Sequence, residues 1–129
     1  REVKQFLSFA GGTPLQQAAA TGLALPADEL ARSLRAKRDR LTAGLRDAGF
    51  EVFPSAGTYF LNADCRPLGY EDAAELCRAL PHEAGVVAIP VSAFSARPDG
   101  PVRSVVRFAF CKRDEVLDDA IARLRAWAK

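Results

Sequence analysis

The amino-acid sequence predicts an α+β fold, with a small, mostly antiparallel sheet and helices on one face of it. After two helices, the chain alternates short strand-like runs with amphipathic helices, an order that favours such a layer. The composition, 129 residues with 49% hydrophobic and 26% charged side chains, is typical of a folded globular domain. No apolar run approaches the roughly 18 residues that a membrane span needs.

Two helices are expected at the start of the chain. Thr13 is a suitable N-cap and Pro14 suits the first helical position, so the alanine-rich run 15–25 should be helical. A longer helix is expected from 26–28, with leucines at helical spacing, and it should end before Gly49. The first helix has no place in the predicted layer, and we expect it to pack on a domain outside this sequence.

The rest of the chain should form the layer itself. β-Branched and aromatic runs bounded by glycine, proline and serine predict strands, and apolar residues at helical spacing predict helices. The expected strands are 50–53, 58–63, 85–90 and 105–110. The expected helices are 70–80 and 113–127, with irregular loops at 64–69 and 91–103. Strand 85–90 should be short and buried.

Charge and metal-ligand content exclude several classes of function. With 18 basic and 16 acidic residues, nothing in the charge favours a nucleic acid or a membrane surface as a partner. His82 is the single histidine, and the three cysteines are widely spaced, so we expect no metal site. Cys77 should be a core residue, and Cys65 and Cys111 ordinary thiols. The chain holds no methionine and starts at Arg1, which predicts a piece of a longer cytosolic protein.

Arg107 is the residue that stands out. Strand alternation places it on the face opposite to Val106, Phe108 and Phe110, which should be core. Its neighbours on its own face are also apolar. A guanidinium in such surroundings needs an anion, and its planar fork matches a carboxylate through two parallel hydrogen bonds. The partner is a protein Asp or Glu or a ligand carboxylate, unless the side chain simply faces solvent.

Three stretches resemble one family when they are taken together and in order: FAGGTPLQ (9–16), AGTYF (56–60) and VRFAFCK (106–112). They are similar to the C-terminal third of the class I/II (fold type I) aminotransferases, which use pyridoxal 5′-phosphate. The last stretch resembles the branch with kynurenine and glutamine aminotransferases. RPLGY (66–70) and CRALP (77–81) are most similar to bacterial N-succinyldiaminopimelate aminotransferases. The resemblance covers essentially the whole chain.

The resemblance implies roles for individual residues. Arg107 matches the arginine that binds the substrate α-carboxylate, and Tyr59 matches an aromatic residue that lines the substrate pocket. Phe9, Gly11, Gly12 and Thr13 match a segment at the dimer interface that reaches toward the neighbouring subunit's active site, where Phe9 would help to select the side chain. The alternatives are a core aromatic for Tyr59 and a plain helix-capping turn for the segment 9–13.

The resemblance also implies a domain division and a missing part. Residues 1–25 would end the large cofactor-binding domain, and 26–129 would be the C-terminal small domain. The family's Schiff-base lysine stands in a Ser-x-Ser-Lys-like motif, which the sequence lacks. The lysines present have other contexts: Lys4, Lys37, Lys112 and Lys129. We therefore expect the catalytic lysine and most cofactor ligands to lie outside this chain, and the chain alone to be inactive.

The function so implied is amino-group transfer between an amino acid and a 2-oxo acid, with N-succinyldiaminopimelate and 2-oxoglutarate as the expected pair. Such an enzyme would serve lysine biosynthesis as a cytoplasmic homodimer. One alternative is a free-standing α+β module that binds a small carboxylate through Arg107. Another is the C-terminal part of a kynurenine or glutamine aminotransferase, or of a cysteine-conjugate β-lyase.

Overall fold

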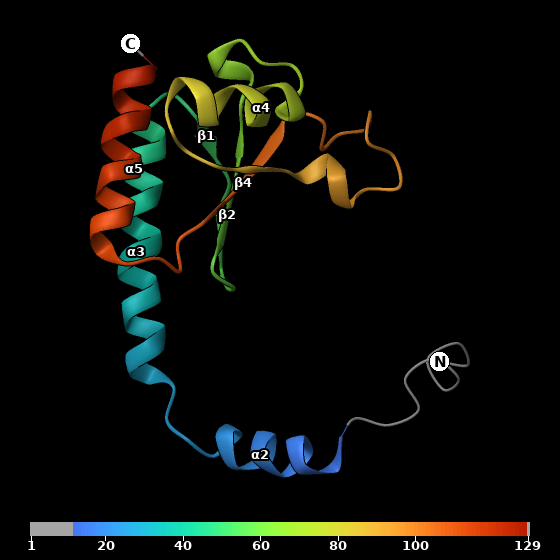
Figure 1. The fold of residues 1–129 in the computed structure, drawn as a ribbon, viewed down its shortest axis with the longest axis vertical. Coiled ribbons are helices and arrows are strands. Elements are labelled where there is room, and N and C mark those ends of the chain that lie inside the picture. The colour runs from blue at the N-terminus through green and yellow to red at the C-terminus, as the bar shows by residue number, and fades with distance from the viewer. Residues whose placement is uncertain (1–11, 129) are drawn as a thin grey trace. The chain divides into compact units, whose positions relative to one another are not determined.

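The structure is a computed structural model that describes residues 12–128 (Figure 1). The chain divides into two compact units, residues 1–31 and 32–129, and the boundary falls within a helix. Along the described chain, no helix is both long enough and apolar enough to cross a membrane.

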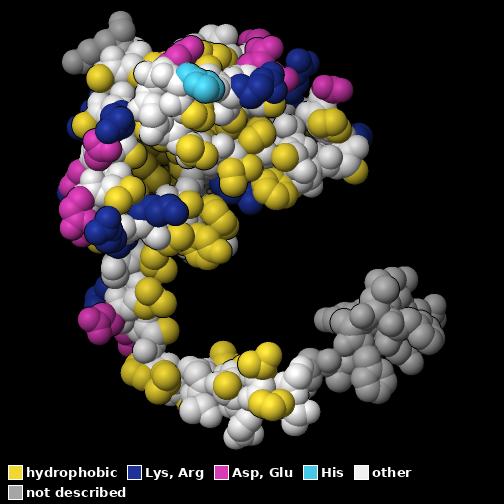
Figure 2. Space-filling model, in the orientation of Figure 1, with side chains coloured by type: hydrophobic (Ala, Val, Ile, Leu, Met, Phe, Trp, Pro, Cys, Tyr) yellow, Lys and Arg dark blue, Asp and Glu magenta, His cyan; other side chains and the backbone are white. Residues whose placement is uncertain are grey.

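The first unit contains α2 (Thr13–Leu23), a helix with no buried residue. Hydrophobic side chains stay visible along this helix in the space-filling view (Figure 2), and Leu15 and Leu23 are 73% and 88% exposed. We expected Thr13 to be the N-cap, but the N-cap is Gly12. The N–H groups of Leu15 and Gln16 both donate to the Gly12 carbonyl oxygen. The helix therefore begins one residue earlier than predicted.

The second unit is built on a four-stranded, fully antiparallel sheet in the order β1-β2-β4-β3. The strands are β1 (Glu51–Val52), β2 (Phe60–Asp64), β3 (Ile89–Pro90) and β4 (Val105–Ala109). The central pair, β2 and β4, is joined along its full length. This arrangement confirms the predicted fold class.

Three helices supply the apolar surface that closes one face of the sheet: α3 (Asp28–Asp47), α4 (Ala73–Glu83) and α5 (Asp114–Trp127). Leu45, Leu76 and Leu124, one from each helix, are fully buried in a single cluster with Leu61 and Val106 of the sheet. In Figure 1, α3 and α5 run side by side. Gly44 makes this contact close, because a Cβ there would lie 2.6 Å from Ile121.

Several elements differ from the prediction at their ends. The third helix begins at Ala73 because the Asp72 carboxylate accepts the N–H of Ala74 at 2.8 Å and caps it. It then continues through Pro81 to Glu83. Only residues 89–90 of the expected strand 85–90 pair with β4, and Val87 is 76% exposed, so that run is neither a full strand nor wholly buried. Short 3₁₀ helices occupy Arg66–Leu68 (η1) and Val91–Phe94 (η2), where loops were expected.

Candidate functional site

Arg107 lies in the middle of β4, on the face of the sheet that the helices do not cover. Val106 and Phe108, its neighbours in the strand, are buried against the helices, which confirms the predicted alternation. In the antiparallel register, Arg107 is opposite Asn62 of β2 and Ile89 of β3. We call the face that carries Arg107, Asn62 and Ile89 the open face.

Two aromatic rings and one amide contact the Arg107 guanidinium. Its Cζ atom lies 5.0 Å from the ring centroid of Phe60 and 4.8 Å from that of Phe94, within cation–π range. Its Nε donates to Asn62 Oδ1 at 3.4 Å, a long hydrogen bond. The guanidinium is half-buried in mostly apolar surroundings, as the sequence predicted.

No carboxylate among residues 12–128 pairs with Arg107. The carboxylate next in line on the same face is Asp64, which the register places diagonally from Arg107, a spacing that an arginine can bridge. Asp64 is 2% exposed and is already bound by Arg66, whose side chain donates at 2.6–3.1 Å and whose backbone N–H donates at 2.9 Å. These hydrogen bonds from Arg66 hold the pKa of Asp64 below its usual value. The internal partner is thus occupied, and the guanidinium is left without an anion from the described chain.

A half-buried guanidinium with this environment is suited to bind a carboxylate. Its planar fork can donate two parallel hydrogen bonds, and the adjacent rings reduce the competition from water. An ammonium group in the same place would lack the fork geometry. The arrangement therefore favours an acid group that arrives with a ligand over an internal ion pair.

Tyr59 lies beside this cluster and not in it. Its ring centroid is 4.4 Å from that of Phe60, whereas the cation–π contacts of Arg107 are with Phe60 and Phe94. Its carbonyl accepts the N–H of Phe110 at 2.9 Å, and the residue is 46% exposed, so it is not a core aromatic within this unit. Just before Tyr59, Thr58 has a φ of 62°, which interrupts the extended backbone. The strand β2 therefore begins at Phe60 and not at the predicted residue 58.

The predicted interface segment belongs to the first unit. Phe9 and Gly11 lie outside the described residues. Gly12 and Thr13 are exposed at the start of α2. Their role at a neighbouring active site stays a prediction.

Sequence reasoning missed the three side chains that contact Arg107: Phe60, Asn62 and Phe94. Alternation along residues 60–64 would have placed Phe60 and Asn62 on one face. The register between the two strands is what places Asn62 opposite Arg107 and Phe60 opposite Ala109. No sequence signal marks Phe94, which follows the strand β3 in a segment predicted as an irregular loop.

The cysteines and the histidine do not form a second site in the described chain. Cys65, and not Cys77 as predicted, is the fully buried thiol; Cys77 is only partly buried. Burial raises the pKa of each to about 11, so both are inert thiols at neutral pH. Cys111 is exposed and free. No group of three metal-ligating side chains occurs within residues 12–128.

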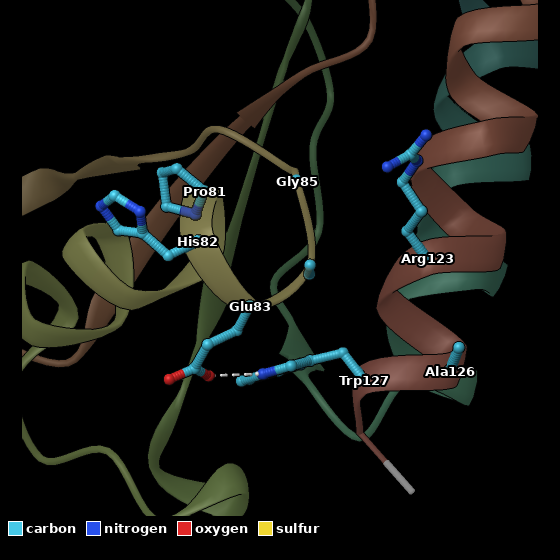
Figure 3. A pocket seen from close by; sticks show the side chains of 8 residues that line it. Pro81, His82, Glu83, Gly85, Arg123, Ala126 and Trp127 are labelled. Atoms are coloured by element: carbon cyan, nitrogen blue, oxygen red, sulfur yellow. Dashed lines mark hydrogen bonds between the residues drawn. The ribbon is translucent and has the colours of Figure 1, made fainter.

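A groove of about 500 Å³ lies where the ends of α4 and α5 meet (Figure 3). Glu83 accepts the indole N–H of Trp127 at 2.7 Å across it, whereas the His82 side chain points away from Arg123. Its polar groups do not converge on one point, so the groove is not a candidate reaction site.

The family model for aminotransferases of class I and II matches residues 1–124 of the chain. A Mycobacterium tuberculosis protein, named probable N-succinyldiaminopimelate aminotransferase DapC, is 51% identical over the whole chain, which covers 35% of that relative. Methionine aminotransferase of Escherichia coli is 40% identical over 97% of the chain and 33% of the relative. Kynurenine–oxoglutarate transaminase 3 of the rat is 31% identical over 98% of the chain and 32% of the relative.

The fold agrees with these matches. A solved structure of N-succinyldiaminopimelate aminotransferase from Mycobacterium tuberculosis superposes with a TM-score of 0.80 and 54% identity, over 96% of this chain and 33% of that one. The chain spans about a third of the length of the curated relatives it matches. Its fold, its motifs and the family match agree, and the chain belongs to the class I and II aminotransferase family.

Proposed function

We propose that this chain supplies the site that binds the α-carboxylate of the substrate in an aminotransferase, with Arg107 as the carboxylate-binding residue. One observation carries the proposal. The guanidinium is half-buried on the open face, and no carboxylate of the described chain neutralises it, because Arg66 already binds Asp64. Every amino acid and every 2-oxo acid carries a carboxylate at this position, so one arginine can orient both the donor and the acceptor.

Aminotransferases of this family generally depend on pyridoxal 5′-phosphate. The described residues do not fit its covalent attachment. Lys37 donates to the Lys112 carbonyl oxygen at 2.5 Å and pairs with Asp114 at 3.5 Å, which ties it to the helical side of the sheet. Lys112 is exposed beyond the end of β4, with its backbone beside α3. We therefore propose that the Schiff-base lysine and most cofactor ligands belong to the intact enzyme outside this sequence, and that this chain alone is inactive.

The substrate pair we propose is N-succinyldiaminopimelate with 2-oxoglutarate, which would place the enzyme in lysine biosynthesis. The support is the 51% identity to the Mycobacterium tuberculosis relative. The second candidate is an amino acid with an apolar or aromatic side chain. The rings of Phe60 and Phe94 at Arg107, with Tyr59 next to Phe60, favour it. The methionine and kynurenine enzymes among the relatives favour it too.

The wider organisation is part of the same proposal. Residues 1–25 end the large domain, residues 26–129 form the small domain, and the intact enzyme is a cytoplasmic homodimer. In that dimer Phe9, Gly11, Gly12 and Thr13 would lie near the neighbouring subunit's active site, and Tyr59 would line the substrate pocket. The exposed leucines of α2 are consistent with a helix that packs on a further domain.

The test of the carboxylate site is Arg107→Ala in the intact enzyme. We expect a higher KM and a lower kcat/KM for the amino acid and for 2-oxoglutarate alike, because the contact is common to both. The fall in kcat/KM should correspond to a loss of roughly 2–4 kcal/mol of transition-state stabilisation. Arg107→Lys should recover only part of the loss, since an ammonium lacks the planar fork. Arg123→Ala, the same truncation on the exposed side of α5, is the matched control and should change nothing. Unchanged kinetics in Arg107→Ala would refute the assignment.

The substrate class is tested separately with a panel of donors on the unmodified enzyme. N-succinyldiaminopimelate, methionine and kynurenine are compared by kcat/KM with 2-oxoglutarate as the common acceptor. A preference of at least about tenfold for N-succinyldiaminopimelate supports the first substrate proposal. A preference for either of the others supports the second candidate.

A further inference from the structure

Phe94 contacts Arg107 from outside the four strands. Its ring centroid is 4.8 Å from the guanidinium carbon, yet the residue is 65% exposed within the described chain and does not belong to the buried core. Burial in this unit therefore does not explain where the ring lies. The contact with Arg107 is the specific interaction that the structure gives it.

The backbone around Phe94 is fixed on both sides. Before it, Ile89 and Pro90 pair with β4 directly opposite Arg107 and Val106, so the end of β3 lies next to Arg107. After it, the N–H of Ser95 donates to the carbonyl of Ser92 at 3.0 Å. The hydroxyl of Ser95 accepts the N–H of Arg97 and donates to its carbonyl, each at 3.1 Å. The ring is thus carried by an anchored 3₁₀ turn, η2, and not by a free loop.

The effect on Arg107 follows from the shape of its side chain. An arginine side chain has many rotamers, and a carboxylate that binds a mobile guanidinium must first order it. A ring face attracts the guanidinium carbon while the N–H donors remain in the guanidinium plane, where a carboxylate can reach them. Phe60 from β2 and Phe94 from η2 provide two such rings, whereas the long hydrogen bond that Arg107 donates to Asn62 Oδ1 would alone hold only Nε.

We propose that Phe94 is a positioning residue for the carboxylate site: its ring fixes the plane of the Arg107 guanidinium before the substrate binds. This inference rests on the proposed function of Arg107. It makes η2 a functional part of the site, although η2 supplies no group that itself binds the carboxylate.

The test uses Phe94→Leu in the intact enzyme, which removes the ring and keeps an apolar side chain of similar bulk. KM should rise roughly three- to tenfold for N-succinyldiaminopimelate, methionine and 2-oxoglutarate alike, with kcat within about twofold of the original. Phe94→Tyr, which keeps the ring, should have the KM of the original enzyme. Val87→Ala, an exposed apolar residue near β3, is the control and should leave KM unchanged.

A double mutant separates positioning from a general structural role. In Arg107→Lys the guanidinium is absent, so adding Phe94→Leu should raise KM by less than about twofold further. If the two single effects multiply instead, Phe94 acts independently of Arg107 and the inference is wrong. Phe94→Met provides a second ring-free variant in case the leucine lowers the melting temperature.

The failures of the two proposals can be told apart. If Arg107→Ala leaves KM and kcat/KM unchanged, the carboxylate site itself is wrong, and the role of Phe94 falls with it. If Arg107→Ala weakens every substrate but Phe94→Leu, at an unchanged melting temperature, does not, then only the positioning role is wrong. A rise in KM confined to one substrate would also contradict positioning, because a carboxylate effect must be common to all of them.

Discussion

The two faces of the same sheet differ in almost every property. On the helical face Leu61, Val106 and Phe108 are buried in one apolar cluster with residues of all three helices. On the open face Asn62 and Arg107 are half-buried and contact mainly each other and nearby rings. The side chains that stabilise the fold and those of the proposed carboxylate site thus lie on opposite faces of the same two strands, because successive side chains of a strand point to opposite faces. Substitutions on the two faces should therefore have different consequences.

The largest expected difference comes from the same truncation on the two faces. Phe108 is buried and packs edge-to-face on Phe50 with ring centroids 5.4 Å apart, so Phe108→Ala should cost about 3–5 kcal/mol of unfolding free energy. Phe60→Ala on the open face should cost only about 1 kcal/mol, because less surface is buried there. Urea unfolding of both variants measures the contrast. Equal losses would mean that the open face is part of the core.

Asp64 is the exception on the open face, since it is buried and bound by Arg66. Asp64→Asn should cost about 1–3 kcal/mol at pH 7. The pKa of Asp64 is lowered in the folded protein, so its stabilising effect is complete above its ordinary value of 3.8 and is lost as the pH falls through the folded pKa. Urea unfolding at pH 7 and pH 3 should therefore show the gap between the two proteins shrinking in acid.

An exposed ion pair provides the control for Asp64. Asp119 pairs with Arg123 on the surface of α5, and Asp119→Asn should cost no more than about 0.5 kcal/mol. A gap between wild type and Asp64→Asn that stays constant from pH 7 to pH 3 would contradict a stabilising role for the ionised carboxylate.

Thr58 decides where the alternation of β2 begins. Its φ of 62° is unfavourable for a β-branched residue and costless for glycine, so Thr58→Gly should raise the unfolding free energy by up to about 1 kcal/mol. Thr42→Gly inside α3 is the matched control and should lower it by several tenths of a kcal/mol. Thermal unfolding distinguishes the two signs. A loss of stability at both positions would show that the backbone at Thr58 stores no strain.

The smallest effect on stability is expected where the effect on activity is largest. Arg107→Met should change the unfolding free energy by no more than about 0.5 kcal/mol, because no ion pair of the described chain is broken and the apolar stem is kept. Chemical unfolding measures the change. A loss of 2 kcal/mol or more would indicate that Arg107 is a structural residue and would remove the contrast between the two faces.

Much of this could be predicted from the sequence. The strand period at 105–110 placed Arg107 opposite to the core. Apolar residues at helical spacing, together with proline and glycine signals, located the described α-helices but not the two 3₁₀ helices. The ends of elements were less certain. Asp72 and Gly12 act as caps one or a few residues away from the expected positions, and Thr58 delays β2, because such ends depend on local hydrogen bonds and backbone angles.

The sequence by itself determined which face of its strand Arg107 occupies, since side-chain alternation is a local property of the chain. Only the tertiary structure decided what surrounds it. Strand register places Asn62 and Phe60 there, and the turn after β3 places Phe94. Asp64 does not pair with Arg107, because Arg66 already binds its carboxylate. Register and turn placement depend on how distant segments pack together. No local pattern in the sequence records that packing.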